Sequence, residues 1–403
     1  MGNVIVAQSG GPTVAINASL AGVIEGALRS NYDKIYGSIN GILGIKDDNI
    51  IDLSEIANSD STFLQKLKTT PAMYLGSCRF KLPSADSGDP VYNTLFQQFS
   101  KYNIDAFFYI GGNDSMDTVD KLSAYAKSID SHIRFIGIPK TIDNDLCITD
   151  HTPGFGSAAK YIATTTMEVI YDALIYNSPS VTIIEVMGRD AGWLTAATSL
   201  ARNEYCCGPD LIYLPETPFN TELFIADLSR LLKEKTNIVV AVSEGIRDAA
   251  GKYISASTGT LDNFGHAQLS GAGKTLEYLV KDRLGVKVRS IEVNVLQRAA
   301  AHCASLTDQN ESVEQGRHGV AFAEQGVTGA MVILKRTSNA PYTVEYSYAH
   351  IHDIANEAKE VPQNWINESH NWITQEMLDY LQPLVLGEPD LTYKNGLPVY
   401  VRR

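Results

Sequence analysis

Two short polar loops, each directly after an apolar run, place the strongest constraint on how this chain folds. Residues 111–115 (Gly-Gly-Asn-Asp-Ser) follow the apolar run 106–110, and residues 139–145 (Pro-Lys-Thr-Ile-Asp-Asn-Asp) follow the run 135–138. Short apolar runs bounded by turn residues predict strands buried on both faces, as in parallel sheets that lie between helices. Both loops are therefore expected at the carboxyl edge of a sheet, where α/β proteins bind their ligands.

The residues of these loops indicate a ligand that carries phosphate. The first loop can bring backbone N–H groups close to an anion at the start of a helix. The second offers the ammonium of Lys140, the hydroxyl of Thr141 and the carboxylates of Asp143 and Asp145. In an extended loop the two carboxylates would point to the same side. The alternative is a simple turn, which Asn and Asp favour. A cation, a hydroxyl and paired carboxylates are the groups that phosphoryl transfer to a hydroxyl requires.

The order strand, Gly-rich or polar loop, helix recurs along the chain and predicts the α/β class. The expected strands are residues 4–7, 106–110, 135–138, 181–187 and 238–242, and the expected helices are 15–28, 116–126 and 193–201. Such alternation is typical of parallel sheets covered by helices on both faces. Because 403 residues exceed one ordinary core, two domains of ~100–200 residues each are expected.

Composition excludes several classes of function. A net charge of −13 argues against nucleic acid as a partner. No apolar run approaches the ~20 residues of a membrane span, and no charged-then-apolar leader precedes the first strand, so a cytoplasmic location is expected. The five cysteines form no CxxC pair and the eight histidines show no metal-ligand spacing. The cysteines are expected to be buried, reduced thiols, and the histidines are expected to bind no metal.

Several further motifs fall at the ends of expected strands or in loops. They are residues 8–12 (Gln-Ser-Gly-Gly-Pro), 75–79 (Leu-Gly-Ser-Cys-Arg), 187–192 (Met-Gly-Arg-Asp-Ala-Gly), 243–245 (Ser-Glu-Gly) and 296–298 (Leu-Gln-Arg). In this order and spacing, and together with the two loops, they resemble the phosphofructokinase family, and within it the diphosphate-dependent branch. The resemblance extends from Val4 to about Leu334.

The resemblance implies two Rossmann-like three-layer domains with the active site in the cleft between them. Residues 1–153 with about 299–365 would bind diphosphate and Mg²⁺, and residues 154–298 with about 366–403 would bind the sugar phosphate. Family members are homo-oligomers, so a homodimer or homotetramer is expected. The tail carries helix-like runs at 354–359 and 373–384, for which packing or subunit contact is the expected role.

Roles in catalysis and donor binding follow from the resemblance residue by residue. Asp143 is the expected base for the sugar 1-hydroxyl, with Thr141, Asp145, Lys140 and Asp114 as the other catalytic residues. The expected diphosphate-binding residues are Gly10, Gly11, Arg79, Gly112 and Lys140. Asp114 stands where ATP-using relatives have glycine, and its carboxylate would repel the α-phosphate of a nucleotide. Asn113 stands where most relatives have aspartate, and it is expected to hold Mg²⁺, directly or through water.

The expected sugar-phosphate site combines the second polar loop with motifs of the second half. Its residues are Thr141, Ile142, Asp143, Met187, Gly188, Arg189, Glu244 and Arg298. The implied reaction is reversible transfer of a phosphoryl group from diphosphate to fructose 6-phosphate, in glycolysis or gluconeogenesis. Two alternatives stay open: an ATP-dependent 6-phosphofructokinase, and a non-catalytic regulatory subunit of the same fold.

Residues 271–275 (Gly-Ala-Gly-Lys-Thr) resemble the end of a P-loop, but Gln268 replaces the required glycine. A packing role in the second domain is expected for this turn.

Overall fold

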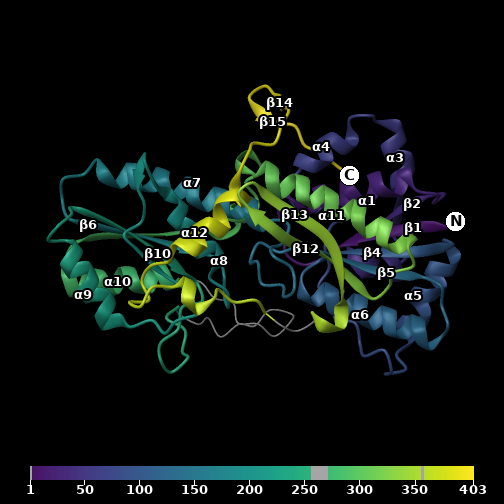
Figure 1. Cartoon of the computed structure of the whole chain (residues 1–403), viewed down its shortest axis with the longest axis horizontal. Helices are drawn as coiled ribbons and strands as arrows, with labels where there is room; N and C mark the ends of the chain where they lie inside the picture. The colour runs from purple at the N-terminus through teal and green to yellow at the C-terminus, as the bar shows by residue number, and fades with distance from the viewer. Residues whose placement is uncertain (1, 256–270, 355–357) are drawn as a thin grey trace.

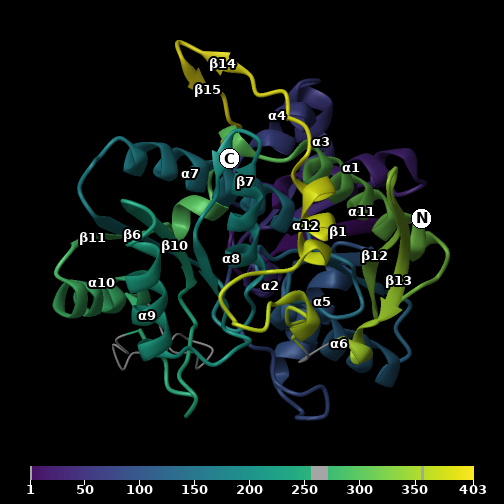
Figure 2. The same cartoon turned by 60° about the vertical axis from the view of Figure 1, so that its left-hand side comes forward.

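Two sheets organise the chain, which a computed structural model describes at residues 2–255, 271–354 and 358–403 (Figures 1 and 2). The larger sheet has the order β13 (Tyr342–His350), β12 (Ala330–Asn339), β5 (Arg134–Pro139), β4 (Ile104–Gly111), β1 (Asn3–Gln8), β2 (Ile35–Ser38) and β3 (Ile50–Asp52). The smaller sheet has the order β11 (Lys287–Glu292), β6 (Ser180–Val186), β10 (Asn237–Ser243) and β9 (Leu211–Tyr213). All pairs in the smaller sheet are parallel, whereas β3 and β13 pair antiparallel at the two edges of the larger one.

Helices cover both faces of each sheet. One face of the larger sheet packs against α1 (Ile16–Arg29), α3 (Leu53–Ser59), α4 (Phe63–Thr69) and α11 (Leu306–Glu324), and the other against α2 (Gly41–Lys46), α5 (Pro90–Lys101) and α6 (Asn113–Ser128). The smaller sheet lies between α7 (Phe155–Leu174), α8 (Trp193–Ala197) and α12 (Gln375–Leu381) on one face and α9 (Thr221–Leu231) and α10 (Ala272–Leu284) on the other. The short hairpins β7 (Arg202–Asn203)–β8 (Cys206–Cys207) and β14 (Tyr393–Lys394)–β15 (Leu397–Pro398) lie outside these layers.

Strand β4 shows why the apolar runs become central strands. Phe107 and Tyr109 face the core under α5 and α6, whereas Phe108 and Ile110 face the core under α1 and α11. Because side chains alternate across a strand, a strand buried on both faces must be apolar at every position. The predicted α/β class, with helix-covered parallel sheets, is confirmed.

The chain leaves the larger sheet once and returns to it. Gly154 has φ +102°, and a Cβ there would lie 2.7 Å from Thr13, so the turn into α7 requires glycine. Asp308 of α11 accepts the Gly154 N–H (2.9 Å) and the Ser157 N–H (3.0 Å). The expected return of the chain after about Arg298 is seen in α11, β12 and β13. The exact domain boundaries stay a prediction.

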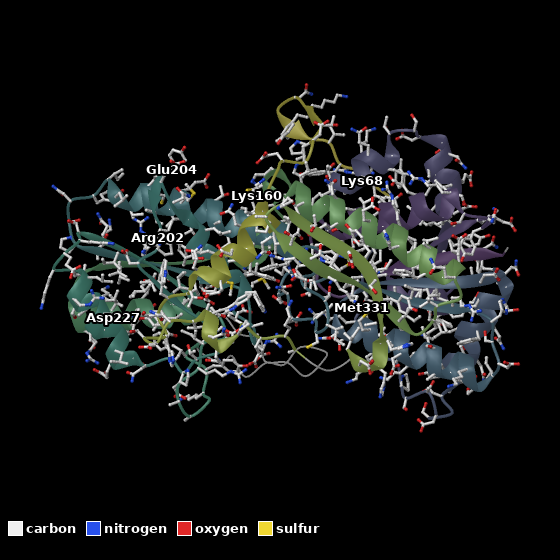
Figure 3. The ribbon with its side chains drawn as sticks, in the orientation of Figure 1. Lys68, Lys160, Arg202, Glu204, Asp227 and Met331 are labelled. Carbon is white, nitrogen blue, oxygen red and sulfur yellow. The ribbon has the colours of Figure 1, made fainter. Side chains whose placement is uncertain are left out.

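The C-terminal tail packs against both units. The run expected at 373–384 contains α12 followed by a 3₁₀ turn, η6 (Gln382–Val385), whereas residues 355–357 of the other run lie outside the described residues. Lys160 of α7 donates to the backbone oxygen atoms of Ala304 (3.1 Å) and Gly387 (2.6 Å) (Figure 3). At the other end the Val401 N–H donates to Thr70 Oγ1 (3.1 Å). The tail therefore has a packing role.

Two further expectations can be compared with the described residues. Within them, no helix has both the length and the apolar character required to cross a bilayer. All five cysteines are described and all are free thiols. Cys78 and Cys206 are buried as expected, but the expected burial is wrong for Cys207, which is exposed, and for Cys147 and Cys303, which are half-buried.

We predict that Gly22→Ala destabilises the protein by about 2 kcal/mol, because overpacking of a close helix crossing is costly. A Cβ on Gly22 of α1 would lie 2.0 Å from the backbone oxygen of Val313 in α11. Urea unfolding would measure the change. Gly26→Ala on the same helix is the matched control, since its Cβ would lie 3.2 Å from Val320 and should cost less. Equal losses in both variants would contradict this account of the crossing.

Candidate functional site

The two polar loops lie side by side at the carboxyl edge of the larger sheet. Strand β4 ends at Gly111, Gly112 precedes α6, and the Lys140 N–H donates to the Gly111 oxygen (2.9 Å). A Cβ on Gly111 would lie 1.9 Å from Ser115 Oγ, so only glycine allows this turn into the helix. The positive end of the α6 dipole therefore faces the same edge as the second loop.

Two cations converge on the glycine pair that follows β1. Lys140 is 3% exposed, and its Nζ donates to the Gly11 oxygen (2.7 Å). A Cβ on Gly10 would lie 3.1 Å from Lys140 Nζ, and one on Gly11 would lie 3.2 Å from Arg298 Nη1. Residues from two distant parts of the sequence thus bring positive charge to one loop, as an anion site requires.

The loop 141–145 is a compact turn, and the expected extended form is wrong at Asn144. Asn144 is fully buried and has φ +57°. The Asp143 N–H donates to Thr141 Oγ1 (3.1 Å), and the Thr141 hydroxyl donates to Asp143 Oδ2 (3.4 Å). Asn tolerates this left-handed backbone because its amide can form local hydrogen bonds. The Asp145 carboxylate still lies close enough to raise the pKa of Asp143.

Burial and like charge set the ionisation of this loop. Burial, followed by the charge of Asp145, raises the pKa of Asp143 to about 6, although Lys140 and Arg189 act in the opposite direction. Burial also raises the pKa of Asp145. The pKa of Lys140 falls to about 8 because burial outweighs its attraction to the two carboxylates. A carboxyl with its pKa near neutrality is suited to accept a proton at physiological pH.

The second unit brings Arg189 and Glu244 to the same place. The Gly188 N–H donates to Glu244 Oε1 (3.4 Å), and Gly188 has φ +134°. Burial, followed by the charge of Asp143, raises the pKa of Glu244 to about 7. Because Asp143 follows β5 while Glu244 follows β10, these two candidate residues lie near each other where the two units meet.

Arg298 links the groups of both units. Burial lowers its pKa, Asp143 and Glu244 raise it, and the charge of Arg79 lowers it. The guanidinium therefore lies within electrostatic reach of all three side chains. Arg79 itself is exposed, as is Asp114 in the first turn of α6. The structure thus brings the predicted cations and carboxylates together across the seam between the units.

Two predicted residues, Ile142 and Met187, contribute in other ways. The Ile142 side chain is buried in the core of the second unit, so the backbone of this residue is the part left for a ligand. The Met187 N–H donates to Gln297 Oε1 (3.3 Å). Gln297 lies in a quoted motif but was assigned no role, although its amide holds the loop that presents Arg189.

Asn113 is the candidate for the metal site. Its Oδ1 atom is buried and has no hydrogen-bond partner among the described residues. An unpartnered buried amide oxygen fits a hard cation that prefers oxygen ligands. Within the described residues, no three His, Cys, Asp or Glu side chains are grouped to hold a metal ion. Oxygen atoms of substrate and water would therefore complete the shell.

The turn that resembles a P-loop has the expected packing role. The Gly271 and Gly273 N–H groups donate to the carboxylate of Glu185 in β6 (3.2 and 2.7 Å). These bonds attach the start of α10 to the smaller sheet. Gln268 and the segment 263–270 lie outside the described residues.

Comparison with known proteins agrees with this geometry. The family model for phosphofructokinase matches residues 3–323. The chain belongs to the phosphofructokinase family. It is 40% identical over 403 residues to a pyrophosphate–fructose 6-phosphate 1-phosphotransferase of Xanthomonas campestris, covering 99% of this chain and 96% of the relative. A protein of the same name from Halomonas elongata is 40% identical over 400 residues, with 98% and 94% covered.

Solved structures show the same relationship. A pyrophosphate-dependent phosphofructokinase from Nitrosospira multiformis superposes with a TM-score of 0.89 at 38% identity, covering 99% of this chain and 96% of the other. The predicted phosphofructokinase fold is therefore confirmed. The roles assigned to single site residues stay predictions.

We predict that Asp143→Asn stabilises the protein at neutral pH. The folded protein holds the pKa of Asp143 at about 6, above the usual 3.8. Protonation of Asp143 therefore stabilises the folded protein fully below the unfolded-state pKa of 3.8. This stability is lost as pH rises through the folded-state pKa of about 6. A neutral side chain removes this loss, so the variant should gain about 1–2 kcal/mol at neutral pH and almost nothing near pH 4.

Urea unfolding at both pH values measures this gain. Asp282→Asn at an exposed position of α10 is the control and should change stability at neither pH. An Asp143→Asn variant that is no more stable than the unmodified protein at neutral pH would show that the Asp143 carboxylate is well solvated.

Proposed function

We propose that this enzyme transfers a phosphoryl group reversibly between diphosphate and the 1-hydroxyl of fructose 6-phosphate. The observation that carries the proposal is a half-buried carboxylate, Asp143, that lies between cations of both units. Lys140 approaches it from the first unit and Arg189 from the second. Relatives that cover almost the whole chain carry names for this reaction.

Asp143 acts as the base. It takes the proton of the sugar hydroxyl as that oxygen bonds to the nearer phosphorus and the bridging P–O bond of diphosphate breaks. Lys140 remains protonated at neutral pH because its pKa is about 8. Its ammonium, beside the Gly10–Gly11 loop, neutralises the charge that gathers on the leaving phosphate. Thr141 and Asp145 position the base.

Substrate binding is divided between the units. Gly10, Gly11 and Gly112 offer backbone N–H groups to diphosphate, and Arg79 adds a cation. Arg189 and Arg298 hold the sugar phosphate, while Glu244 and the backbone of Met187 and Gly188 orient its hydroxyls. Asn113 would hold Mg²⁺, which supplies charge neutralisation on diphosphate when bound. We further propose a cytoplasmic homodimer or homotetramer with the domain division given above.

Asp114 favours diphosphate over ATP. Its carboxylate stands in the first turn of α6, directly after the Gly111–Gly112 loop that would receive the donor. A nucleotide donor would bring a further anionic phosphate against it, whereas diphosphate ends before that point. The non-catalytic alternative is disfavoured because the base, its cation and its neighbouring carboxylate are all present and assembled.

We predict that the unmodified enzyme uses diphosphate far better than ATP and that Asp114→Gly raises activity with ATP while lowering activity with diphosphate. A coupled assay with fructose 6-phosphate and Mg²⁺, run with each donor, measures both. Asp114→Asn is the matched variant, since it keeps the size and removes the charge. An unmodified enzyme that prefers ATP would contradict the proposed donor.

We predict that Asp143→Ser lowers kcat about 10²–10⁴-fold, because a positioned general base contributes this factor. In the unmodified enzyme, activity in the direction of sugar phosphorylation should fall below about pH 6, where Asp143 gains its proton. Glu244→Gln is the comparison variant and should raise KM for the sugar phosphate more than it lowers kcat. An Asp143→Ser loss confined to KM would mean that another group takes the proton.

A further inference from the structure

A segment of the C-terminal tail lies directly against the catalytic loop. Ala358 forms a bridge with Leu146, and the Lys359 N–H donates to the Asp145 oxygen (2.8 Å). The backbone that carries the two carboxylates is therefore paired, on one side, with residues more than two hundred positions further along the chain.

The Lys359 ammonium has three N–H groups and three oxygen acceptors, all in the same loop. Nζ donates to Asn144 Oδ1 (3.4 Å) and to the backbone oxygen atoms of Thr149 (3.2 Å) and Asp150 (2.5 Å). The ammonium also lies 5.1 Å from the ring centroid of Trp193. A lysine side chain has no further donors. All three N–H groups of the Lys359 ammonium therefore donate to the loop 144–150.

A second tail residue holds the same amide from its other end. Asn144 Nδ2 donates to the hydroxyl oxygen of Tyr380 in α12 (2.8 Å), and that hydroxyl donates to the Asp150 oxygen (2.7 Å). Asn144 stands between Asp143 and Asp145 and has the positive φ that turns the loop. The tail therefore determines the backbone conformation on which both carboxylates depend.

The tail segment is itself fixed to both units. The Lys359 oxygen accepts from Trp193 Nε1 (2.9 Å), and the Val361 N–H donates to Glu216 Oε1 (3.0 Å), which also accepts the Gly192 N–H (2.7 Å). Trp193 and Gly192 adjoin the loop that presents Arg189. One short segment thus contacts the loops that hold the base and the sugar-phosphate cation.

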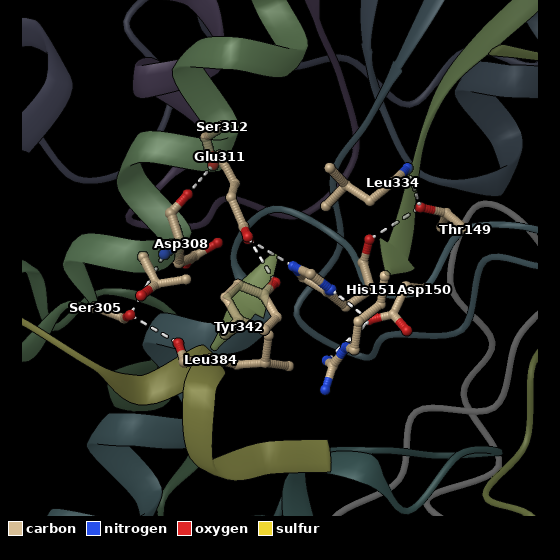
Figure 4. A network of polar contacts seen from close by, with 12 residues as sticks. Thr149, Asp150, His151, Ser305, Asp308, Glu311, Ser312, Leu334, Tyr342 and Leu384 are labelled. Carbon is tan, nitrogen blue, oxygen red and sulfur yellow. Dashed lines mark hydrogen bonds and ion pairs between the residues drawn. The ribbon is translucent and has the colours of Figure 1, made fainter. Parts of the chain in front are cut away.

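The far side of the loop is anchored as well. Figure 4 shows His151 between Asp150 and Glu311, with ring-nitrogen contacts of 2.8 and 2.6 Å. Arg336 of β12 donates to Asp150 Oδ1 (2.9 Å), and Tyr342 of β13 donates to Glu311 (2.6 Å). Because these contacts hold Asp150 and His151 on this side, the contacts from Lys359 and Tyr380 are those that act on Asn144 itself.

We propose that Lys359, assisted by Tyr380, is a positioning residue for the phosphoryl transfer: it fixes Asn144 and thereby sets the place of Asp143 and Asp145. This inference rests on the proposed function. A misplacement of the base by about 1 Å costs on the order of 10²-fold in rate. The contribution of Lys359 to the placement of Asp143 should therefore appear in kcat. Lys359 also adds positive charge beside Asp145.

Charged groups surround both partners of this interaction. Lys359 faces Asp145, Cys147, Asp150 and Arg336. The carboxylate pair faces Lys140, Arg189, Arg298 and Glu244 as well as Lys359. Burial raises the pKa of Asp145 and Lys359 counteracts this, so loss of the cation raises the pH at which the pair is fully ionised.

The test compares Lys359→Met, Lys359→Arg and Tyr380→Phe in the forward assay with fructose 6-phosphate, diphosphate and Mg²⁺. Lys359→Met should lower kcat about 10–100-fold, change both KM values less than about twofold, and move the acid limb of the kcat profile to higher pH. Lys359→Arg should leave that limb in place, because the charge remains. Tyr380→Phe should lower kcat less and leave the limb unmoved, since no charge is lost.

Thermal unfolding of each variant and a matched control separate positioning from folding. Lys335→Met, at an exposed position of β12, should match the unmodified enzyme in every measurement. If a folded Lys359→Met variant has the same kcat as the unmodified enzyme and the same acid limb in its pH profile of kcat, the inference is overturned. If that variant does not fold, unmodified kcat in both Lys359→Arg and Tyr380→Phe would overturn it. An unmodified enzyme without diphosphate-dependent activity would instead contradict the proposed function.

Discussion

The attraction between the buried ammonium of Lys140 and the carboxylates of Asp143 and Asp145 is the interaction on which the rest of the site depends. A buried charge without a partner is costly, so the ammonium and the carboxylates of this loop depend on one another. Gly11 accepts from the ammonium, and Arg298 lies against the same glycine. The glycine pair after β1 therefore leaves room for both cations to approach the backbone, whereas Gly111 is required by its contact with Ser115.

Much of the fold could be predicted because its central strands are apolar at every position. The strands β1, β4, β5, β6 and β10 each end in glycine, lysine or a polar loop, and each was predicted within a few residues. Strand β11 was not predicted. It alternates exposed and half-buried residues at the edge of its sheet, so its short, charged sequence resembles a loop. The pairing of β12 with both β5 and β13 depends on contacts between residues far apart in the sequence, which periodicity does not record.

The site was predicted less completely than the fold. The motif residues of both halves meet at one seam, because the carboxyl ends of parallel strands share an edge. The expected extended loop was wrong, since the left-handed Asn144 is determined by side chains that approach from the tail. Lys359 gives no local signal, because its three acceptors lie 209 to 215 positions earlier in the chain. A solvent-exposed lysine would look the same in the sequence.

A protein with a net charge of −13 can bind two anionic substrates, because its surface charges and the charges of the site act over different distances. Charges on the surface are screened within about 8 Å at physiological ionic strength, whereas buried pairs are screened much less. Lys140, Arg189 and Arg298 are placed among Asp143, Asp145 and Glu244, so the seam carries nearly balanced charge without substrate. Burial, followed by the charge of Asp143, raises the pKa of Glu244 to about 7. An incoming phosphate therefore meets cations whose charge is weakly screened by solvent, because Lys140 is 3% exposed and Arg298 is partly desolvated.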